Sequence, residues 1–212
     1  SRVQPSFDNP EESLSANVLG TSRVMEWSRI NNTKVVYAGS SSKHHKPSES
    51  PYAMYKFLGE EVCKLYKESY NVNVEIARFY NVYGPGENVD EIYGNVIGIW
   101  ISKIMKGEPL PIVGDGEQKR DFIHVHDIVD GLKKIAFSDL HHEDAWELGT
   151  GISYSINNVF QFFNKRFDTS SINIADQPGT YRKTLRENDD TLKLLNWYPK
   201  DRLEEHINNI KI

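Results

Sequence analysis

This sequence of 212 residues has one cysteine, no long apolar run and no excess of positive charge. Its single cysteine, Cys63, excludes an internal disulfide framework and a cysteine-based metal cluster, so we expect no bound metal. No apolar run approaches the roughly 20 residues that a membrane span requires, and no signal-peptide pattern is present. The net charge of −5 argues against nucleic acids or membranes as the main partners. We therefore expect a cytoplasmic protein of one large or two small domains.

Apolar runs alternate with helical patterns along most of the chain. The patterns predict helices over 10–30, 51–70, 96–105, 127–137 and 156–167, and strands over 35–39, 74–79 and 110–113. This alternation indicates right-handed crossovers and a parallel sheet, hence an α/β fold. Cys63 falls inside a predicted helix, and we interpret it as a small buried apolar group rather than a nucleophile.

The segment S-P-Y-A-M-Y-K at 50–56 places Tyr52 and Lys56 four positions apart. Its Ser-Pro entry favours the start of a helix, on which residues at this spacing share a face. A lysine beside a tyrosine lowers the pKa of the phenol and makes it usable as an acid and a base. A hydroxyl from the serine cluster at 40–42 could bind the same substrate oxygen. We interpret this as a catalytic Ser-Tyr-Lys set; the alternative is a chance helical spacing beside a serine-rich loop.

Five segments then follow one another in a recognisable order. They are Y-A-G-S-S-S (37–42), S-P-Y-A-M-Y-K (50–56), A-R-F-Y-N-V-Y-G-P (77–85), V-G-D-G-E-Q-K-R-D-F-I-H-V-H-D (113–127) and L-N-W-Y-P (195–199). In these segments the chain resembles the extended short-chain dehydrogenase/reductase family, in its nucleotide-sugar epimerase/dehydratase branch. The resemblance implies a Rossmann-like fold, NAD as the cofactor and a UDP-sugar or other nucleotide-sugar as the substrate.

One part of that family is not found in the sequence. The family opens with a strand, a G-x-x-G-x-x-G turn and a helix that holds the NAD pyrophosphate, and residues 1–7 resemble a later stretch, after the family's fourth strand. We therefore expect a partial doubly wound parallel sheet, in a fragment or a naturally shortened relative. Residues 1–85 would form the remaining NAD-binding core and residues 86–212 mainly the substrate-binding region, with segments around 110–137 returning to the core.

The resemblance assigns catalytic and cofactor roles residue by residue. Ser40 takes the catalytic hydroxyl position, with Ser41 and Ser42 as alternatives; Tyr52 is the base, and Lys56 holds the nicotinamide ribose and tunes Tyr52. The implied cofactor contacts are Asn17, Tyr52, Lys56, Phe79 and Val82. The connector K-H-H-K-P-S-E-S (43–50) is much shorter than the family's loop, which questions the reach of Ser40. We interpret His44 and His45 as an exposed polar turn, with substrate contact as the alternative.

The resemblance also implies the substrate contacts. These are Ser41, Ser42, Asn81, Asn95, Pro111, Val113, Arg120 and Arg182. The guanidinium of Arg120 has the planar fork that suits a phosphate. Gln177 stands where the family's second arginine is expected, so Arg182 or Arg186 would have to replace it.

The residues after Ser40 bear on the reaction. Sugar 4,6-dehydratases resemble one another in carrying Asp-Glu there, whereas Ser41 and Ser42 cannot act as the acid and base of an elimination. This favours an epimerase, most similar to a UDP-sugar 4-epimerase. The alternatives are a 4,6-dehydratase, a 4-keto-sugar reductase, or a non-catalytic sugar-nucleotide-binding or assembly module. The resemblance further implies a homodimer that packs through helices 10–30 and 52–70.

Overall fold

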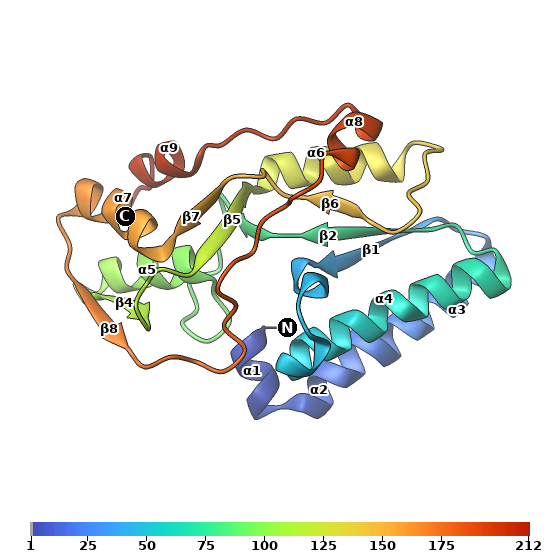
Figure 1. Cartoon of the computed structure of the whole chain (residues 1–212), viewed down its shortest axis with the longest axis horizontal. Helices are drawn as coiled ribbons and strands as arrows, with labels where there is room; N and C mark the ends of the chain where they lie inside the picture. The colour runs from blue at the N-terminus through green and yellow to red at the C-terminus, as the bar shows by residue number, and fades with distance from the viewer. Residues whose placement is uncertain (1) are drawn as a thin grey trace. The chain divides into compact units, whose positions relative to one another are not determined.

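The computed structural model describes residues 2–212, which form two compact units (Figure 1). Unit 1 comprises the described part of Ser1–Phe79 together with Ile128–Leu148 and Asn188–Tyr198. Unit 2 comprises Tyr80–Asp127, Gly149–Glu187 and Pro199–Ile212.

Unit 1 is built on a parallel sheet of three strands in the order β1-β2-β6. The strands are β1 (Val35–Ser40), β2 (Val74–Phe79) and β6 (Trp146–Leu148). Phe79, the last residue of β2, lies opposite Ser40 on one side and Leu148 on the other. The predicted parallel sheet is therefore confirmed, and the serine cluster begins where its first strand ends.

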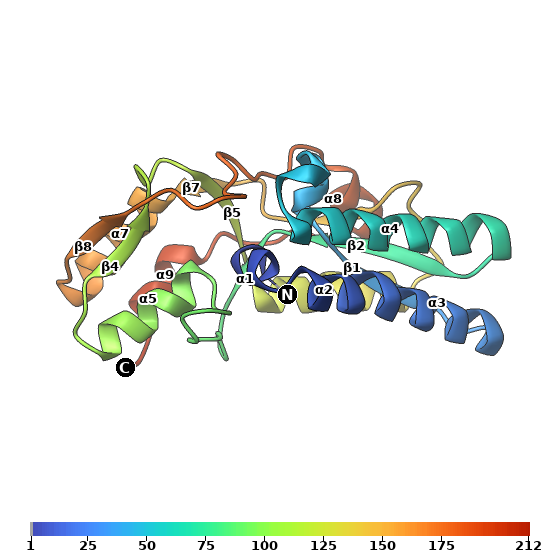
Figure 2. The same ribbon diagram turned by 90° about the horizontal axis from the view of Figure 1, so that it is seen from below.

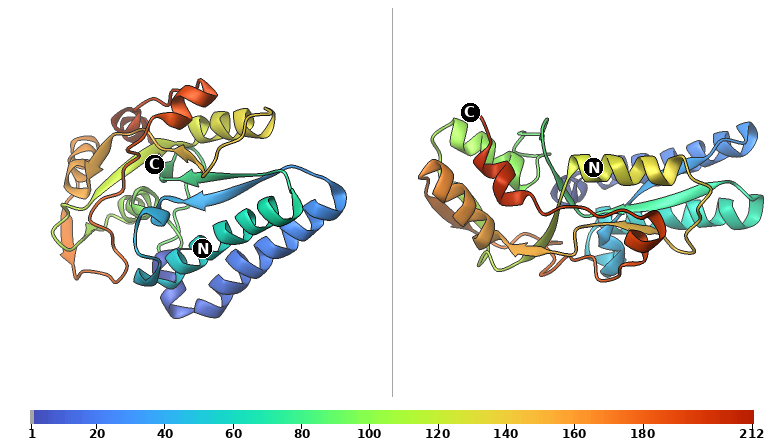
Figure 3. Two further views of the ribbon diagram at one scale, coloured as in Figure 1. Left: turned by 45° about the vertical axis from the view of Figure 1, so that its right-hand side comes forward. Right: turned by 90° about the horizontal axis from the view of Figure 1, so that it is seen from above.

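Helices cover both faces of this sheet. On one face α3 (Gly20–Asn31) and α4 (Pro51–Tyr70) run side by side (Figure 2) and bury Met25 and Cys63 against β2. On the other face lies α6 (Val125–Ala136), drawn in yellow in Figure 3. The absence of a side chain at Gly131 lets this helix approach Leu148 and Trp197. The doubly wound α/β fold is confirmed, as is the buried position of Cys63.

The helix predicted over 10–30 is continuous but not uniform. It consists of α2 (Pro10–Leu14), a π-helical turn η1 (Ser15–Leu19) and α3. The short α1 (Val3–Asp8) precedes it, and α8 (Asp190–Leu195) completes the helices of unit 1. The predicted start of α4 is confirmed, because the Ser50 side chain accepts a hydrogen bond from the Ala53 amide. The helix ends at Asn71, whose φ of 54° closes it in the left-handed conformation.

Unit 2 holds three pairs of short strands. β3 (Asn81–Tyr83) pairs parallel with β5 (Lys119–His124), β5 pairs antiparallel with β7 (Ser153–Ser155), and β4 (Leu110–Val113) pairs parallel with β8 (Ser171–Ile174). The helices are α5 (Val96–Met105), α7 (Ile156–Phe167) and α9 (Leu203–Asn208). Their apolar faces enclose a core in which Trp100, Tyr83 and Phe163 are the largest buried side chains.

Candidate active site

The hydroxyl of Tyr52 lies 3.4 Å from Oγ of Ser40, to which it donates a long hydrogen bond. Ser40 ends β1 and Tyr52 stands in the first turn of α4, so a strand end and a helix start bring the two hydroxyls together. The backbone of that turn is held from elsewhere, because the Tyr52 amide donates to Oγ of the buried Ser6 at 3.0 Å. The short connector thus allows Ser40 to reach the phenol.

The other two serines of the cluster differ in their surroundings. Ser42 is buried and its hydroxyl and amide both donate to Oγ of Ser40, at 2.9 and 3.2 Å. A hydroxyl oxygen has two lone pairs, so the two hydrogen bonds from Ser42 and the longer one from Tyr52 compete for the Ser40 oxygen. The proton of Ser40 is then available to a substrate oxygen. Ser41 begins the short 3₁₀ turn η2 (Ser41–His44) and is partly buried.

Lys56 stands one helical turn beyond Tyr52, as its spacing predicts. Its ammonium donates to the carbonyl of Ala38 at 3.0 Å and lies 5.5 Å from the centre of the Tyr37 ring. Burial lowers the pKa of Lys56, although the charge of Glu60 opposes the shift. With three donors and one acceptor among the described residues, this ammonium can still bind two ligand oxygens.

The acidity of Tyr52 differs from the sequence-based expectation. Burial raises the pKa of the Tyr52 phenol, while the hydrogen bond to Ser40 and the charge of Arg2 act in the opposite direction. The sequence predicted that Lys56 would lower the pKa of Tyr52, but burial dominates and the opposing charge is that of Arg2 rather than Lys56. The phenol is therefore protonated at neutral pH unless a bound ligand changes its surroundings.

The other expected cofactor contacts of unit 1 lie on separate elements. Phe79 sits beside Ser40 at the carboxyl end of the sheet, where α/β proteins bind ligands. Asn17 is buried in the π-helical turn η1, and its amide donates to the carbonyl of Ser13 at 2.8 Å. The backbone of Asn17 packs against Gly59 of α4, where a Cβ would come within 2.8 Å of the Asn17 carbonyl oxygen. Phe79 is thus next to the serine, whereas Asn17 supports the helix of Tyr52.

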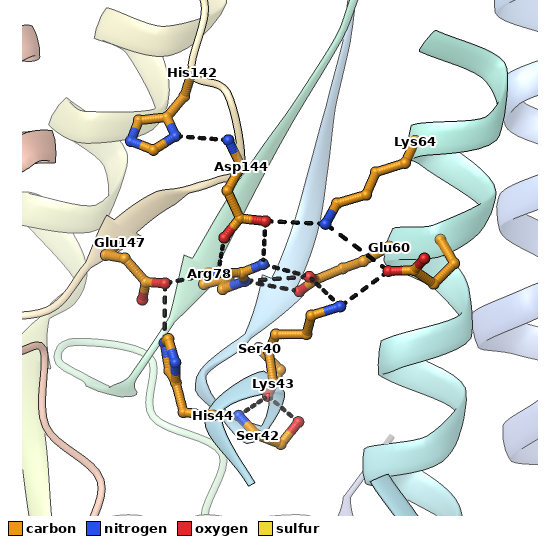
Figure 4. A network of polar contacts seen from close by, with 11 residues as sticks. Ser40, Ser42, Lys43, His44, Glu60, Lys64, Arg78, His142, Asp144 and Glu147 are labelled. Atoms are coloured by element: carbon orange, nitrogen blue, oxygen red, sulfur yellow. Dashed lines mark hydrogen bonds and ion pairs between the residues drawn. The ribbon is translucent and has the colours of Figure 1, made fainter. Parts of the chain in front are cut away.

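A buried network of charges lies between α4 and the strands (Figure 4). Arg78 of β2 is 2% exposed and binds Glu60 of α4 at 2.8 Å, Glu147 of β6 at 2.9 Å and Asp144 at 2.6 Å. Burial opposes its charge, but these carboxylates outweigh burial and raise the pKa of Arg78. His44, from the connector after Ser40, reaches the same network through Glu147 at 3.0 Å. Sequence reasoning missed this network, although a charged residue within the apolar run of β2 was the available signal.

In unit 2 the predicted substrate residues of the N-V-Y-G-P segment are tied to local structure. Asn81 donates to the carbonyl of Asp121 at 3.3 Å and to the hydroxyl of Thr184 at 3.2 Å. Asn95 caps α5, because its side-chain oxygen accepts from two amides of the first turn. Its side-chain amide donates to the carbonyl of Val82 at 2.8 Å, which brings these two predicted residues together.

Arg120 is a cation of unit 2 that has no carboxylate partner among the described residues. Arg120 is partly buried, no carboxylate among residues 2–212 pairs with its guanidinium, and its one hydrogen bond goes to the carbonyl of Lys119 at 2.8 Å. Burial lowers the pKa of Arg120 to about 10, and the nearby charge of Arg182 acts in the same direction. A poorly compensated guanidinium favours an anionic ligand.

The two candidates for a second arginine are already engaged. Arg182 forms a bidentate ion pair with Asp115, with distances of 2.9 and 3.1 Å, on the exposed surface. Arg186 is buried and donates to the carbonyls of Gly149 and Thr150. Arg182 runs beside the edge of β5, since its carbonyl accepts from the Lys119 amide at 2.8 Å.

Pro111 and Val113 lie on β4 and contribute backbone contacts. The indole of Trp100 donates to the Pro111 carbonyl at 2.9 Å, and the side chain of Gln118 donates to the Val113 carbonyl at 3.0 Å. Both side chains are partly exposed. Their backbones are fixed while their side chains remain available to a ligand.

Comparison with known proteins decides the family. Residues 1–149 match the model of the NAD dependent epimerase/dehydratase family. The chain belongs to this family. A protein of Methanocaldococcus jannaschii named "Putative UDP-glucose 4-epimerase" is 31% identical, over 98% of this chain and 72% of its own length. The resemblance read from the five sequence segments is confirmed.

Other proteins that are similar to this chain carry the names of different activities. UDP-glucuronic acid decarboxylase 2 of Arabidopsis thaliana is 26% identical over 93% of this chain, which spans 48% of that protein. Among solved structures, the UDP-N-acetylglucosamine 4-epimerase of Methanobrevibacter ruminantium, in complex with UDP-N-acetylmuramic acid, aligns with a TM-score of 0.87. It is 28% identical, and the alignment covers 98% of this chain and 71% of that one. Membership in the family therefore leaves the individual reaction open.

The residues present fit one end of the family's cofactor. The spare donors of Lys56 and the adjacent hydroxyls of Ser40 and Tyr52 suit a ribose and an oxidisable sugar hydroxyl. No glycine-rich G-x-x-G-x-x-G segment for the pyrophosphate occurs in the 212 residues. Within residues 2–212, no group of three or more His, Cys, Asp and Glu side chains is placed to hold a metal ion. No helix in the same range is long and apolar enough to cross a membrane.

Proposed function

We propose that this chain carries the catalytic and substrate-binding residues of an NAD-dependent epimerase that acts at C4 of a UDP-sugar. The observation that supports the proposal is the contact between Ser40 and Tyr52, with Lys56 one turn further along the same helix. A hydroxyl that can donate, a phenol that can exchange a proton and a nearby ammonium are the groups needed to oxidise an alcohol reversibly.

The proton chemistry follows from the hydrogen bonds. In its phenolate form Tyr52 accepts the proton of the sugar C4 hydroxyl, and Ser40 donates to the same oxygen as it becomes a carbonyl. The chemistry that NAD would supply, when bound, is acceptance of a hydride from the sugar carbon. Lys56 would hold the nicotinamide ribose with its spare donors and favour the phenolate form of Tyr52. After the keto-sugar has turned its other face, the hydride would return from the reduced cofactor to the sugar carbon and Tyr52 would return the proton to the oxygen.

The residues beside Ser40 support epimerisation over dehydration. A dehydratase must remove a carbon-bound proton and protonate a leaving hydroxyl, for which a carboxylate and a carboxylic acid are suited. Ser41 and Ser42 offer hydroxyls at these positions, and Ser42 is already used in holding Ser40. Epimerisation requires one proton to move on and off one oxygen, which Tyr52 alone can perform.

Arg120 is the proposed principal contact of the substrate diphosphate. Its guanidinium lacks a carboxylate partner among residues 2–212, so a phosphate would supply the missing counter-charge. Arg182 would contribute as a second contact only after leaving Asp115. Pro111 and Val113 of β4 are proposed to line the nucleotide base, and Asn81 and Asn95 to lie near the phosphates.

We also propose a homodimer that packs through α3 and α4. Apolar side chains are exposed on both helices: Leu19, Val24, Trp27 and Ile30 at 50–68% on or next to α3, and Leu65 and Tyr70 at 53 and 54% on α4. An apolar patch of this kind on two adjacent helices is typical of a protein interface.

The test begins with NAD, measured as cofactor released by acid from the purified chain and by titration. The chain is then incubated with UDP-glucose, UDP-N-acetylglucosamine and UDP-glucuronate, and the products are identified by NMR. A C4 epimer supports the proposal. A 4-keto-6-deoxy sugar would instead indicate a dehydratase, a reduced 4-keto-sugar a reductase, and loss of CO2 from UDP-glucuronate a decarboxylase.

One observation favours a second candidate, a non-catalytic sugar-nucleotide-binding or assembly module. Arg120 and its neighbours are in place in unit 2, whereas the glycine-rich turn of the cofactor site is not found in the sequence. UDP-sugar binding with no NAD binding, and no product from any substrate, would support this alternative over the epimerase.

A further inference from the structure

Two basic side chains, Lys43 and His44, hold the connector between Ser40 and Tyr52 near the end of β1. Lys43 pairs with Glu61 at 3.0 Å and approaches Glu60 at 3.9 Å, and its ammonium lies 4.0 Å from the centre of the Phe57 ring. All three partners belong to α4, the helix that carries Tyr52. Lys43 therefore connects the turn η2 to α4, the helix on which Tyr52 lies.

His44 ties the turn to the sheet. Its Nε2 lies 3.0 Å from Oε1 of Glu147, a carboxylate of β6 that is 3% exposed. The histidine itself is half-exposed, so it can exchange protons with solvent. Figure 4 shows His44 below Glu147, on the side of the network where Ser40 and Ser42 lie.

The charges around His44 favour its protonated form. It faces Glu147 of β6, Arg78 of β2 and Glu60 of α4. Arg78 is shared among three carboxylates, of which Asp144 also pairs with Lys64 at 3.0 Å. The negative charge of Glu147 beside His44 favours a proton on the imidazole. The hydrogen bond to Glu147 is the largest cause that raises the pKa of His44, with burial acting against it.

We propose that His44 is a positioning residue that, by pairing with Glu147, holds the turn η2 so that Ser42 and Ser40 are aligned with the phenol of Tyr52. The chain of contacts is continuous: His44 ends η2, Ser42 lies within it, and Ser42 holds the Ser40 oxygen with two hydrogen bonds. Glu147 and Glu60 are both fixed by the buried Arg78. The alignment of Ser40 therefore depends on the protonation of a residue that touches no reacting atom.

This inference rests on the proposed function for its catalytic meaning but can be tested without turnover. Protein labelled with ¹³C at tyrosine Cζ and at the histidine rings is titrated by NMR, and the Tyr52 signal is assigned with Tyr52→Phe. In the wild type we expect the Tyr52 signal to shift with the same midpoint as the His44 ring. That midpoint should lie above the ordinary histidine value of 6.5 and move down in Glu147→Gln.

Three variants separate the possible causes. His44→Lys keeps a cation beside Glu147 at every pH, so the Tyr52 signal should stay at its low-pH wild-type position. His44→Ala should show the high-pH position throughout, and His45→Ala, the matched control in the same connector, should behave as the wild type. The proposal is overturned if the Tyr52 NMR signal does not shift as His44 titrates, or if His45→Ala has the same effect on that signal as His44→Ala.

Turnover supplies an independent reading. Where the wild type is active, His44→Ala should lower kcat about 10- to 100-fold with little change in KM, because misalignment affects the reacting groups rather than binding. His44→Lys should restore kcat and remove the matching step from the pH profile; failure to do so would count against the proposal. If the NMR shifts appear as expected but no epimer forms, the positioning role stands and the proposed function fails.

Discussion

The side chain of Ser40 lies within 3.4 Å of the Tyr52 hydroxyl although the connector between them is very short. The contact forms because η2 follows β1 directly and Ser50 caps the start of α4. A longer loop is therefore not needed to bring the end of a strand to the start of a helix. This contact is the basis of the first prediction.

Replacing Tyr52 with Phe should abolish epimerisation while the fold is retained. Loss of a general acid and base costs about 10²–10⁴-fold in rate, and removal of the phenol hydroxyl disturbs one long hydrogen bond. The measurement is conversion of UDP-sugars followed by NMR, with circular dichroism to check the fold. Tyr55→Phe, on the same helix, is the matched control. Full activity in Tyr52→Phe would exclude the mechanism proposed above.

Arg120→Leu should weaken the binding of UDP about 10- to 100-fold, because a charged hydrogen bond contributes about 1.5–3 kcal/mol. Arg182→Leu should have a smaller effect, since Arg182 is engaged with Asp115. Isothermal titration of UDP into each variant gives the comparison. Equal losses in both variants would contradict the assignment of Arg120 as the principal phosphate contact.

Arg78→Leu should destabilise unit 1 by about 3–5 kcal/mol, because it leaves Glu60 and Glu147 buried without their partner. Urea unfolding monitored by fluorescence measures the change. The control is Arg29→Leu, which breaks a pair with Glu26 on the exposed surface of α3 and should have little effect. A small change for Arg78 would mean that its carboxylates find other partners.

Acid should weaken unit 2 through its histidines. Burial lowers the pKa of His206 and is also the largest cause of the lowered pKa of His124, whose ring lies 5.7 Å from that of His206. As the pH falls, the unfolded chain binds these protons first, near the ordinary value of 6.5. The stability is thus present above pH 6.5 and is lost as the pH falls through it toward the lowered values.

The variant His206→Gln lacks the titrating group of His206, so its stability no longer contains the pH-dependent contribution of this residue. The loss of stability of the variant relative to the wild type should be larger at pH 7.5 than at pH 5.5, as measured by thermal unfolding. The contribution of His44 to stability has the opposite sign, because a raised pKa stabilises the folded state at low pH. The wild type and His206→Gln both contain His44, so its contribution cancels when these two proteins are compared. A difference that does not change with pH would contradict this prediction.

Trp27→Glu should convert the proposed homodimer to a monomer. Trp27 is 56% exposed on α3, and a carboxylate placed in an apolar interface would lose its hydration without a partner. Light scattering coupled to size-exclusion chromatography measures the mass. Phe137→Glu is the control, since Phe137 is 87% exposed and lies just after α6 rather than on α3 or α4. A monomeric wild type would remove the basis for this proposal.

Much of the fold could be predicted from local patterns. The bounds of α4, β2, α5, β4 and α7 follow from apolar periodicity, caps and turn residues, all of which act within a few positions of each other. The strand β8 was not foreseen, because each of its four residues is exposed and its pairing with β4 is distant in sequence. The π-helical turn η1 was also missed, since its sequence is compatible with an ordinary helix.

The candidate site was predicted in its residue types but not in its contacts. The spacing of Tyr52 and Lys56 is a local property, and a helix places both on one face wherever it occurs. Which serine contacts the Tyr52 hydroxyl depends on the conformation of η2. In the structure it is Ser40, whose oxygen also accepts a hydrogen bond from Ser42. The acidity of Tyr52 was misjudged because desolvation depends on the surrounding packing, which no local pattern contains.

The sequence by itself determined the family, the order of helices and strands, and the Tyr-Lys pair, because motifs and periodicity are written in neighbouring residues. Only the tertiary structure decided which charges are satisfied. His44 and Glu147 are 103 positions apart, and their pairing exists only because β6 lies beside β2 in the folded sheet. In the same way, folding pairs Arg182 with Asp115 and leaves Arg120 without a carboxylate among residues 2–212. Long-range electrostatics depend on distance in space, which the order of residues does not specify.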